Sequence, residues 1–232
     1  MRLNQESFKS VLWNGKVSRH TFDGEGNPLH MVSAFSSECR MVLAQEKVSD
    51  KSNEIIAIPR LLDLLALEDA IVTIDAMGCQ REIAQLICDK QADYILSLKG
   101  NQGTLHQDTQ LVFQDDALLK ELGVKVHQTV DGSEHGRLEE RIYRVVEIPD
   151  ILKKQHDWFG LKSLVEVISH REIKGACSKE KRYYITSLGK DAVKIGNTIR
   201  SHWSIENNLH WVLDISFRDK VMHQKTFASS SI

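Results

Sequence analysis

The stretch Ile71-Val72-Thr73-Ile74-Asp75-Ala76-Met77-Gly78 decides how this chain folds. Its first four residues form a short, largely apolar run, which is typical of a strand buried on both faces of a parallel sheet. Asp75 closes the run, and the carboxyl end of such a strand is the edge where α/β sheets bind their ligands. Asp is also a favoured N-cap, so this residue alone predicts either a functional carboxylate or a helix cap.

Strands and helices alternate downstream of this run. The spacing of Ile83, Leu86 and Ile87 predicts a helix over 81–90, and residues 92–98 form a second apolar strand before a helix over 104–116. This order is typical of parallel strand-helix-strand pairing.

Upstream, residues 10–16, 29–35 and 41–48 have the pattern of an antiparallel meander, with a turn at 23–28. A helix over about 52–67 follows, and Pro59 falls inside it, where a kink or a restart is expected.

The segment 124–188 differs from the preceding residues in its predicted secondary structure. Residues 124–130, 138–146, 161–171 and 182–187 are rich in β-branched and aromatic side chains and predict four more strands. They form either an antiparallel insertion or a continuation of the sheet, and a helix from Asp191 to about Phe217 comes after them. We expect a single domain over 1–232 in which 124–188 is a β-rich insertion before the last helix.

Composition sets the class of protein. The 232 residues are 41% hydrophobic and 27% charged, as in ordinary soluble globular proteins. No run approaches the roughly 20 apolar residues of a membrane span, and the first residues lack an apolar signal core, so we expect a cytoplasmic protein without a membrane partner. Four cysteines without a Cys-x-x-Cys pair predict reduced, mostly buried thiols.

The net charge of -2 argues against a uniformly basic nucleic-acid binder, but charge is unevenly distributed. A local positive field attracts a phosphate backbone, although a solvated charged helix has the same composition. From residue 181 onward the sequence contains eight basic and four acidic residues. The basic residues are Lys181, Arg182, Lys190, Lys194, Arg200, Arg218, Lys220 and Lys225, and the acidic residues are Asp191, Glu206, Asp214 and Asp219.

The turn Lys99-Gly100-Asn101-Gln102 ends the strand after Asp75, at the same edge of the sheet. A lysine and amide side chains beside a carboxylate are able to hold a phosphate backbone. Taken alone, the turn is better explained as a polar cap of the following helix.

The last helix carries His202, Glu206 and His210 at intervals of four residues, along one face. A zinc site from all three is one interpretation, but the two histidines are about 12 Å apart along the axis, too far to share one ion. Geometry favours Glu206 alone as a metal ligand, with the histidines and Trp203 and Trp211 packing the helix or touching DNA. An amphipathic helix with core tryptophans is the third interpretation.

Asp75 and Glu206 together indicate a magnesium site for phosphoryl transfer. Two carboxylates drawn together without a cation would repel, and one would take up a proton. A divalent ion bound by carboxylates and phosphate oxygens removes that penalty, polarises the phosphodiester and activates the attacking water or hydroxyl.

The chain resembles the DDE transposases of the H-repeat-associated (ISAs-type) insertion sequences over residues 11 to about 219. Order, spacing and content of the motifs all match. They are Ser33-Ala34-Phe35-Ser36, Lys51-Ser52-Asn53-Glu54-Ile55, Ala57-Ile58-Pro59, Thr73-Ile74-Asp75-Ala76-Met77-Gly78-Cys79-Gln80, Leu98-Lys99-Gly100-Asn101-Gln102-Gly103, His135-Gly136-Arg137, Arg182-Tyr183-Tyr184-Ile185, Arg200-Ser201-His202-Trp203-Ser204-Ile205-Glu206-Asn207 and His210-Trp211-Val212-Leu213-Asp214.

The resemblance implies a ribonuclease-H-like fold, a mixed five-stranded sheet flanked by helices and interrupted by a β-rich insertion. It implies Mg²⁺ or Mn²⁺ held by Asp75 and Glu206, and double-stranded DNA, the element's ends and its target, as partner. Water would cut the element's end, and the freed 3′-hydroxyl would then attack the target. The residues expected to face DNA are Lys99, Asn101, Arg200 and His202.

One departure weakens the expected chemistry. The family's first Asp lies in an Ile-Asp-Gly-Lys motif, which here reads Trp13-Asn14-Gly15-Lys16. Asn14 offers a neutral carbonyl where the site needs a negative charge. The family's helical segment before this strand and its basic helix after Asp219 also have no match, which predicts a fragment cut at both ends.

We therefore expect a transposase with impaired DNA cleavage and strand transfer, in the cytoplasm and associated with the nucleoid. The alternatives are a non-catalytic DNA-binding remnant, an inert folded relic, and a zinc hydrolase built on His202, Glu206 and His210. The sequence leaves open whether the chain forms a homodimer.

Overall fold

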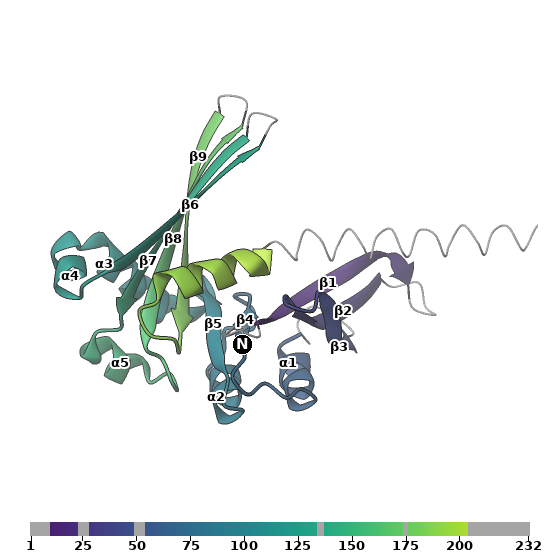
Figure 1. Ribbon diagram of the computed structural model, residues 1–232. Coiled ribbons are helices and arrows are strands. Elements are labelled where there is room, and N and C mark those ends of the chain that lie inside the picture. The colour runs from purple at the N-terminus through teal and green to yellow at the C-terminus, as the bar shows by residue number, and fades with distance from the viewer. Residues whose placement is uncertain (1–9, 23–27, 49–53, 134–136, 174–175, 204–232) are drawn as a thin grey trace, which may run out of the picture.

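The computed structural model describes residues 10–22, 28–48, 54–133, 137–173 and 176–203. Within them it is a mixed α/β structure with one large, mostly antiparallel sheet of nine strands, in the order β3-β2-β1-β4-β5-β9-β8-β7-β6 (Figure 1). The strands are β1 (Ser10–Phe22), β2 (Pro28–Ser36), β3 (Met41–Val48), β4 (Ile71–Ile74), β5 (Asp93–Leu98), β6 (Lys125–Ser133), β7 (Arg137–Glu147), β8 (Ser163–Ile173) and β9 (Ala176–Thr186). The helices are α1 (Glu54–Asp63), α2 (Arg81–Asp89), η2 (Gly100–Gln102), α3 (Gly103–Gln114), α4 (Asp116–Glu121), α5 (Asp150–His156) and a helix over 192–203.

Three parallel strands form the centre of the sheet. β4 pairs in parallel with β1 on one side and with β5 on the other, and all four of its residues are buried. The helix α2 provides the crossover between β4 and β5. This confirms the parallel pairing predicted from the alternation of strands and helices, and the meander β1-β2-β3 is antiparallel as predicted.

The sheet has nine strands rather than the expected five because the segment 124–188 continues it. β9 pairs antiparallel with β5, and β8, β7 and β6 follow outward. These four strands extend beyond the helices as a long twisted arm (Figure 1). β5 is therefore covered on both sides by hydrogen-bonded neighbours instead of presenting an open edge.

Two short helices were not expected from the sequence. In α4, the side chain of Asp115 accepts a hydrogen bond from the Leu118 N–H at 3.0 Å and caps the N-terminus. In α5, the helix ends at Asp157 in a left-handed conformation. Pro59 neither interrupts nor restarts α1, which runs through it.

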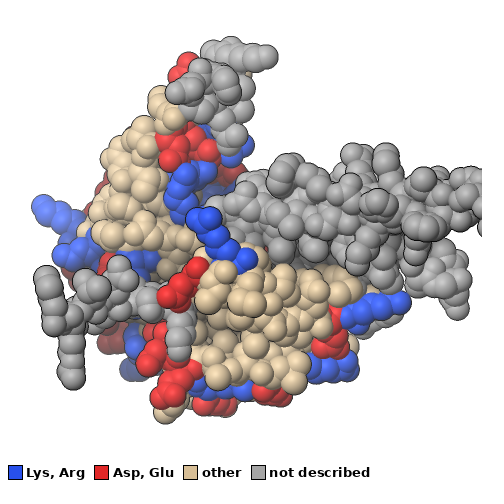
Figure 2. All heavy atoms as spheres, turned by 45° about the vertical axis from the view of Figure 1, so that its right-hand side comes forward, with Lys and Arg blue, Asp and Glu red and all other residues tan. Residues whose placement is uncertain are grey.

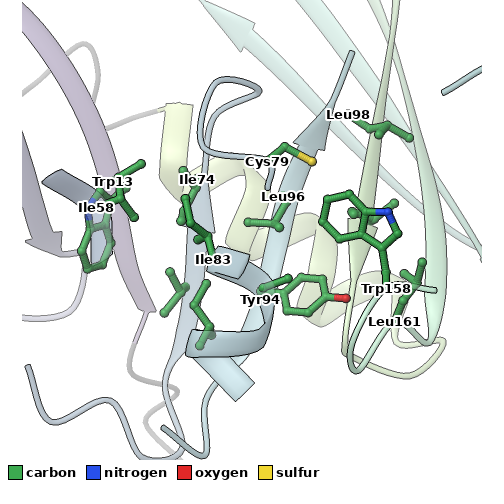
Figure 3. Close-up of a cluster of buried hydrophobic side chains, with 14 of the residues drawn as sticks. Trp13, Ile58, Ile74, Cys79, Ile83, Tyr94, Leu96, Leu98, Trp158 and Leu161 are labelled. Carbon is green, nitrogen blue, oxygen red and sulfur yellow. The ribbon is translucent and has the colours of Figure 1, made fainter. Parts of the chain in front are cut away.

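The sheet separates two cores. One lies against α1, α2, α3 and α5 and contains Trp13, Ile74, Tyr94 and Leu96 (Figure 3). The other lies under the helix 192–203, whose Ile195 and Ile199 pack with residues of β4, β5, β7, β8 and β9. Successive residues of β4 therefore serve opposite faces, which places Thr73 on the side of the helix 192–203.

No helix in the described part of the chain combines the length and apolar character needed to cross a lipid bilayer.

Candidate functional site

A pocket of about 140 Å³ opens where β4 and β5 end beneath the last turn of the helix 192–203. Its walls combine carboxylate, ammonium, hydroxyl and imidazole groups with aromatic rings. The lining residues are Thr73, Ile74, Asp75, Ala76, Ile95, Ser97, Lys99, Tyr184, Ile199, His202 and Trp203. The structure thus brings together three residues singled out from the sequence, Asp75, Lys99 and His202.

Asp75 directly follows β4 and is exposed to solvent. Its Oδ1 accepts hydrogen bonds from the backbone N–H groups of Met77 at 3.1 Å and Gly78 at 3.4 Å. It is not a helix cap, because α2 begins six residues later with Gln80 in the N-cap position. The carboxylate shapes its own turn through Oδ1, and the residue lines the pocket.

The turn after β5 holds the Asp75 loop in place. Asn101 Nδ2 donates to the carbonyl of Ala76 at 2.7 Å, and Gln102 Nε2 donates to the carbonyl of Cys79 at 2.8 Å. Asn101, which was expected to face DNA, therefore has its amide committed to the protein backbone. Lys99 is exposed and lines the pocket.

The thiol of Cys79 lies buried beneath this loop. Burial, and secondarily the charge of Asp75, raises its pKa to about 12. Cys79 is thus a protonated, apolar part of the core. The prediction that most of the four thiols are buried is wrong, because Cys39 and Cys177 are exposed and Cys88 is half-buried.

His202 anchors the helix 192–203 to the central strand. Its Nδ1 lies 2.8 Å from the hydroxyl of Thr73, and the tautomer decides which of the two atoms donates. Burial lowers the pKa of His202 to about 4, while the charge of Asp75 acts in the opposite direction. The imidazole is therefore neutral at physiological pH, with one nitrogen already bound to Thr73.

Trp203 gives the helix a second anchor, on β9. Its indole N–H donates to the hydroxyl of Tyr184 at 3.3 Å, and the guanidinium of Arg182 lies 4.1 Å from the centre of its ring. Sequence reasoning did not assign Arg182 and Tyr184 to the site. Their alternate positions on a predicted strand were the available signal, because they place both residues on one face.

Arg200, also expected to face DNA, is paired with the arm. Its guanidinium lies 2.6 Å from Oδ2 of Asp131 on β6, an oxygen shared with Arg141 at 3.0 Å. On the face shown in Figure 2, acidic and basic side chains intermingle rather than forming a field of one sign.

Register places Asn14 level with Asp75. Leu12 of β1 is paired with Thr73 of β4, and both Asn14 and Asp75 lie two residues further along parallel strands. On its other side Asn14 is paired with Ser33 of β2. Glu206 and His210 lie outside the described residues, and within those residues no three His, Cys, Asp or Glu side chains gather closely enough to hold a metal ion.

We expect Gly78→Ala to destabilise the Asp75 loop. An added Cβ would overlap Ile74 Cγ2 and lie 2.8 Å from Ile58 Cδ1, both in the core beneath the loop. Overpacking of this kind costs about 1–3 kcal/mol in free energy of unfolding. Urea denaturation measures the loss, and Gly100→Ala, where a Cβ meets nothing within 4 Å, is the matched control. Equal stability of the two variants would contradict the packing described.

The pKa of His202 predicts an acid-sensitive fold. The native pKa of about 4 lies below the ordinary 6.5, so the unfolded chain binds the proton more tightly. The stabilisation is complete above pH 6.5 and is lost as the pH falls towards 4. Between pH 7 and pH 5 we expect the wild type to lose about 2 kcal/mol more than His202→Gln, measured by urea denaturation at each pH. Between pH 7 and pH 8 the two proteins should change alike, and parallel curves down to pH 5 would refute the assignment.

Comparison with known proteins identifies the family of the chain. The model of the family described as Transposase DDE domain matches residues 12–230. The chain is 43% identical over 212 residues to "Putative transposase YncI" of Escherichia coli O157:H7, covering 89% of this chain and 54% of that protein. It is 41% identical over 211 residues to "H repeat-associated putative transposase YhhI" of Escherichia coli K12, covering 87% of this chain and 55% of that protein.

Among solved structures, the piggyBac transposase synaptic complex with hairpin DNA has a TM-score of 0.38 at 7% identity, over 79% of this chain and 34% of that chain. That score is too low to establish a shared fold. The chain spans about half the length of the curated relatives it matches. The family resemblance drawn from its motifs is confirmed, and the chain belongs to the Transposase DDE domain family.

Proposed function

We propose that this chain is the ribonuclease-H-like catalytic domain of an insertion-sequence transposase, which binds double-stranded DNA and whose metal-dependent cleavage and strand transfer are impaired by Asn14. The proposal places it in the cytoplasm, in association with the nucleoid.

The observation that carries the proposal is the register of the three parallel strands. Leu12 of β1 is paired with Thr73 of β4, and two residues further along lie Asn14, still within β1, and Asp75, which follows β4 and lines a polar pocket. The order β3-β2-β1-β4-β5, with a meander followed by parallel strands, supports the proposal of a ribonuclease-H-like core within the nine-stranded sheet. Glu206 follows His202 by four residues in the sequence, and His202 contacts Thr73 of the central strand.

The donor chemistry around Asp75 fits a hard divalent cation. Both hydrogen bonds from the loop go to Oδ1 of Asp75, so Oδ2 is available as an oxygen ligand. Asp75 and Glu206 would hold Mg²⁺ or Mn²⁺, and when bound such an ion supplies polarisation of the phosphodiester and activation of the attacking oxygen. Asn14, in the third position, contributes a neutral carbonyl and no charge.

The four residues expected to face DNA have supporting roles in the proposed site. Lys99 would attract a phosphate by charge, as an exposed ammonium on the pocket wall. His202, neutral and bound to Thr73, would hold the last helix against β4 and offer its second ring nitrogen to the DNA. Asn101 would keep the Asp75 loop in position rather than contact DNA directly. Arg200 would reach a phosphate only after leaving Asp131.

Metal binding tests the site directly. We expect wild-type protein to bind Mn²⁺ weakly by isothermal titration calorimetry, because one of three charged ligands is missing. Restoring the carboxylate in Asn14→Asp should tighten binding about tenfold or more, since hard cations prefer charged oxygen ligands. Asp75→Asn should remove the heat of binding, with Asp69→Asn as an exposed control outside the pocket. Unchanged binding in both Asn14→Asp and Asp75→Asn would refute the assignment.

DNA binding and chemistry separate the catalytic proposal from the remnant. We expect the protein to bind double-stranded DNA with an affinity that falls steeply with salt, because Lys and Arg replace counterions along the backbone. Strand transfer of element-end DNA with Mg²⁺ should be weak or undetectable, measured by gel. Cleavage at a rate that Asn14→Asp does not raise would contradict the impairment. Binding without any product in either protein would favour the non-catalytic remnant, and no binding at all would favour the inert relic.

A further inference from the structure

The outer strand of the arm, β6, has one side without a partner strand. It pairs with β7 over its whole length, from Lys125 to Ser133, and it is the last strand in the sheet order. Within the described residues no strand pairs with its other side. A long edge strand exposes a row of backbone N–H and C=O groups that readily bind another strand.

The side chains of β6 lack most of the features that protect such an edge. Val126 and Val130 are 57% and 60% exposed, and both are β-branched residues favoured in strands. The strand contains no proline. Among the described residues, Lys125 is exposed and has no ion pair, and both ion pairs of Asp131 use Oδ2, which leaves its Oδ1 open.

One face of β6 is covered and the other is not. The helix 192–203 lies over the covered face, where Arg200 contacts Asp131 and a Cβ on Gly196 would lie 3.0 Å from the His127 ring. Val126 and Val130 lie on the opposite face. A second strand can therefore approach the edge without displacing this helix.

We propose that β6 pairs antiparallel with β6 of a second copy of this chain, about a twofold axis at Gln128. In this register Lys125 lies opposite Asp131 of the second copy, and Val126 lies opposite Val130 of the second copy. Each match occurs twice because of the symmetry. The pairing joins opposite charges on one face and apolar side chains on the other, the two kinds of cross-strand pair that stabilise sheets.

Charge and shape favour this register over the two registers in which the twofold axis is moved by one residue. If the axis lies at Thr129, Lys125 faces Ser133 and Val126 faces Gly132. If it lies at His127, Lys125 faces Thr129 and Val126 faces Gln128. Of these three, only the axis at Gln128 places an opposite charge across from the exposed lysine and pairs the two exposed valines with each other. The inference goes beyond the proposed chemistry and stands without it, because it uses no residue of the pocket.

Two double variants test the pairing and its register. Val126→Glu with Val130→Glu places two carboxylates opposite each other at both symmetric pairs. Val126→Glu with Val130→Lys places opposite charges there instead. Within one copy Val126 is paired with Arg144 and Val130 with Glu140, so the Glu/Lys variant has favourable neighbours in its own sheet. Leu138→Lys on β7, where the native side chain is 48% exposed one strand inward, is the control for a new surface charge.

Sedimentation velocity over a concentration series measures the dissociation constant, and circular dichroism verifies the fold of each variant. We expect a wild-type dimer, a dissociation constant raised about tenfold or more in the Glu/Glu variant, and recovery in the Glu/Lys variant. Leu138→Lys should dimerise like the wild type. A wild type that stays monomeric at every concentration overturns the proposal, as does a folded Glu/Glu variant that dimerises as tightly as the wild type. Failure of the Glu/Lys variant to recover overturns the register at Gln128.

Discussion

Parallel pairing of β4 with both β1 and β5 is the constraint on which the site depends. Parallel strands bring their carboxyl ends to the same edge of the sheet, so residues that are far apart in the sequence become neighbours there. Through this pairing Asp75 and Lys99, which directly follow β4 and β5, reach the same edge, and Asn14 lies on β1 two residues beyond its last pair with β4. Burial of β4 on both faces makes the register rigid, because a slip of one residue would move Thr73 and Ile74 into the wrong cores.

The helix 192–203 depends on the same constraint from the opposite side. Its apolar residues pack across several strands, and its polar contacts reach Thr73 on β4, Tyr184 on β9 and Asp131 on β6. The central sheet and the arm are therefore joined by one helix as well as by the β5–β9 ladder.

The sequence predicted most of the strands and the position of Asp75, because short apolar runs and helical spacing are local signals. It did not predict α4 and α5, since six- and seven-residue helices carry too little periodicity to separate from turns. It left the place of the segment 124–188 open because strand order depends on long-range pairing, here between β5 and β9. The hydrogen-bond and ion-pair partners of Asn101 and Arg200 could not be predicted from the sequence either, because both contacts join segments at least 25 residues apart. The structure gives both side chains partners within the protein, and their expected contact with DNA stays a prediction.

The two hydrogen bonds from Asn101 and Gln102 to the backbone after β4 have a thermodynamic consequence. They tie the loop that carries Asp75 to the loop that carries Lys99, so the relative freedom of the two segments is given up during folding. A ligand that touches both loops then meets a preorganised cradle and loses little entropy in ordering it.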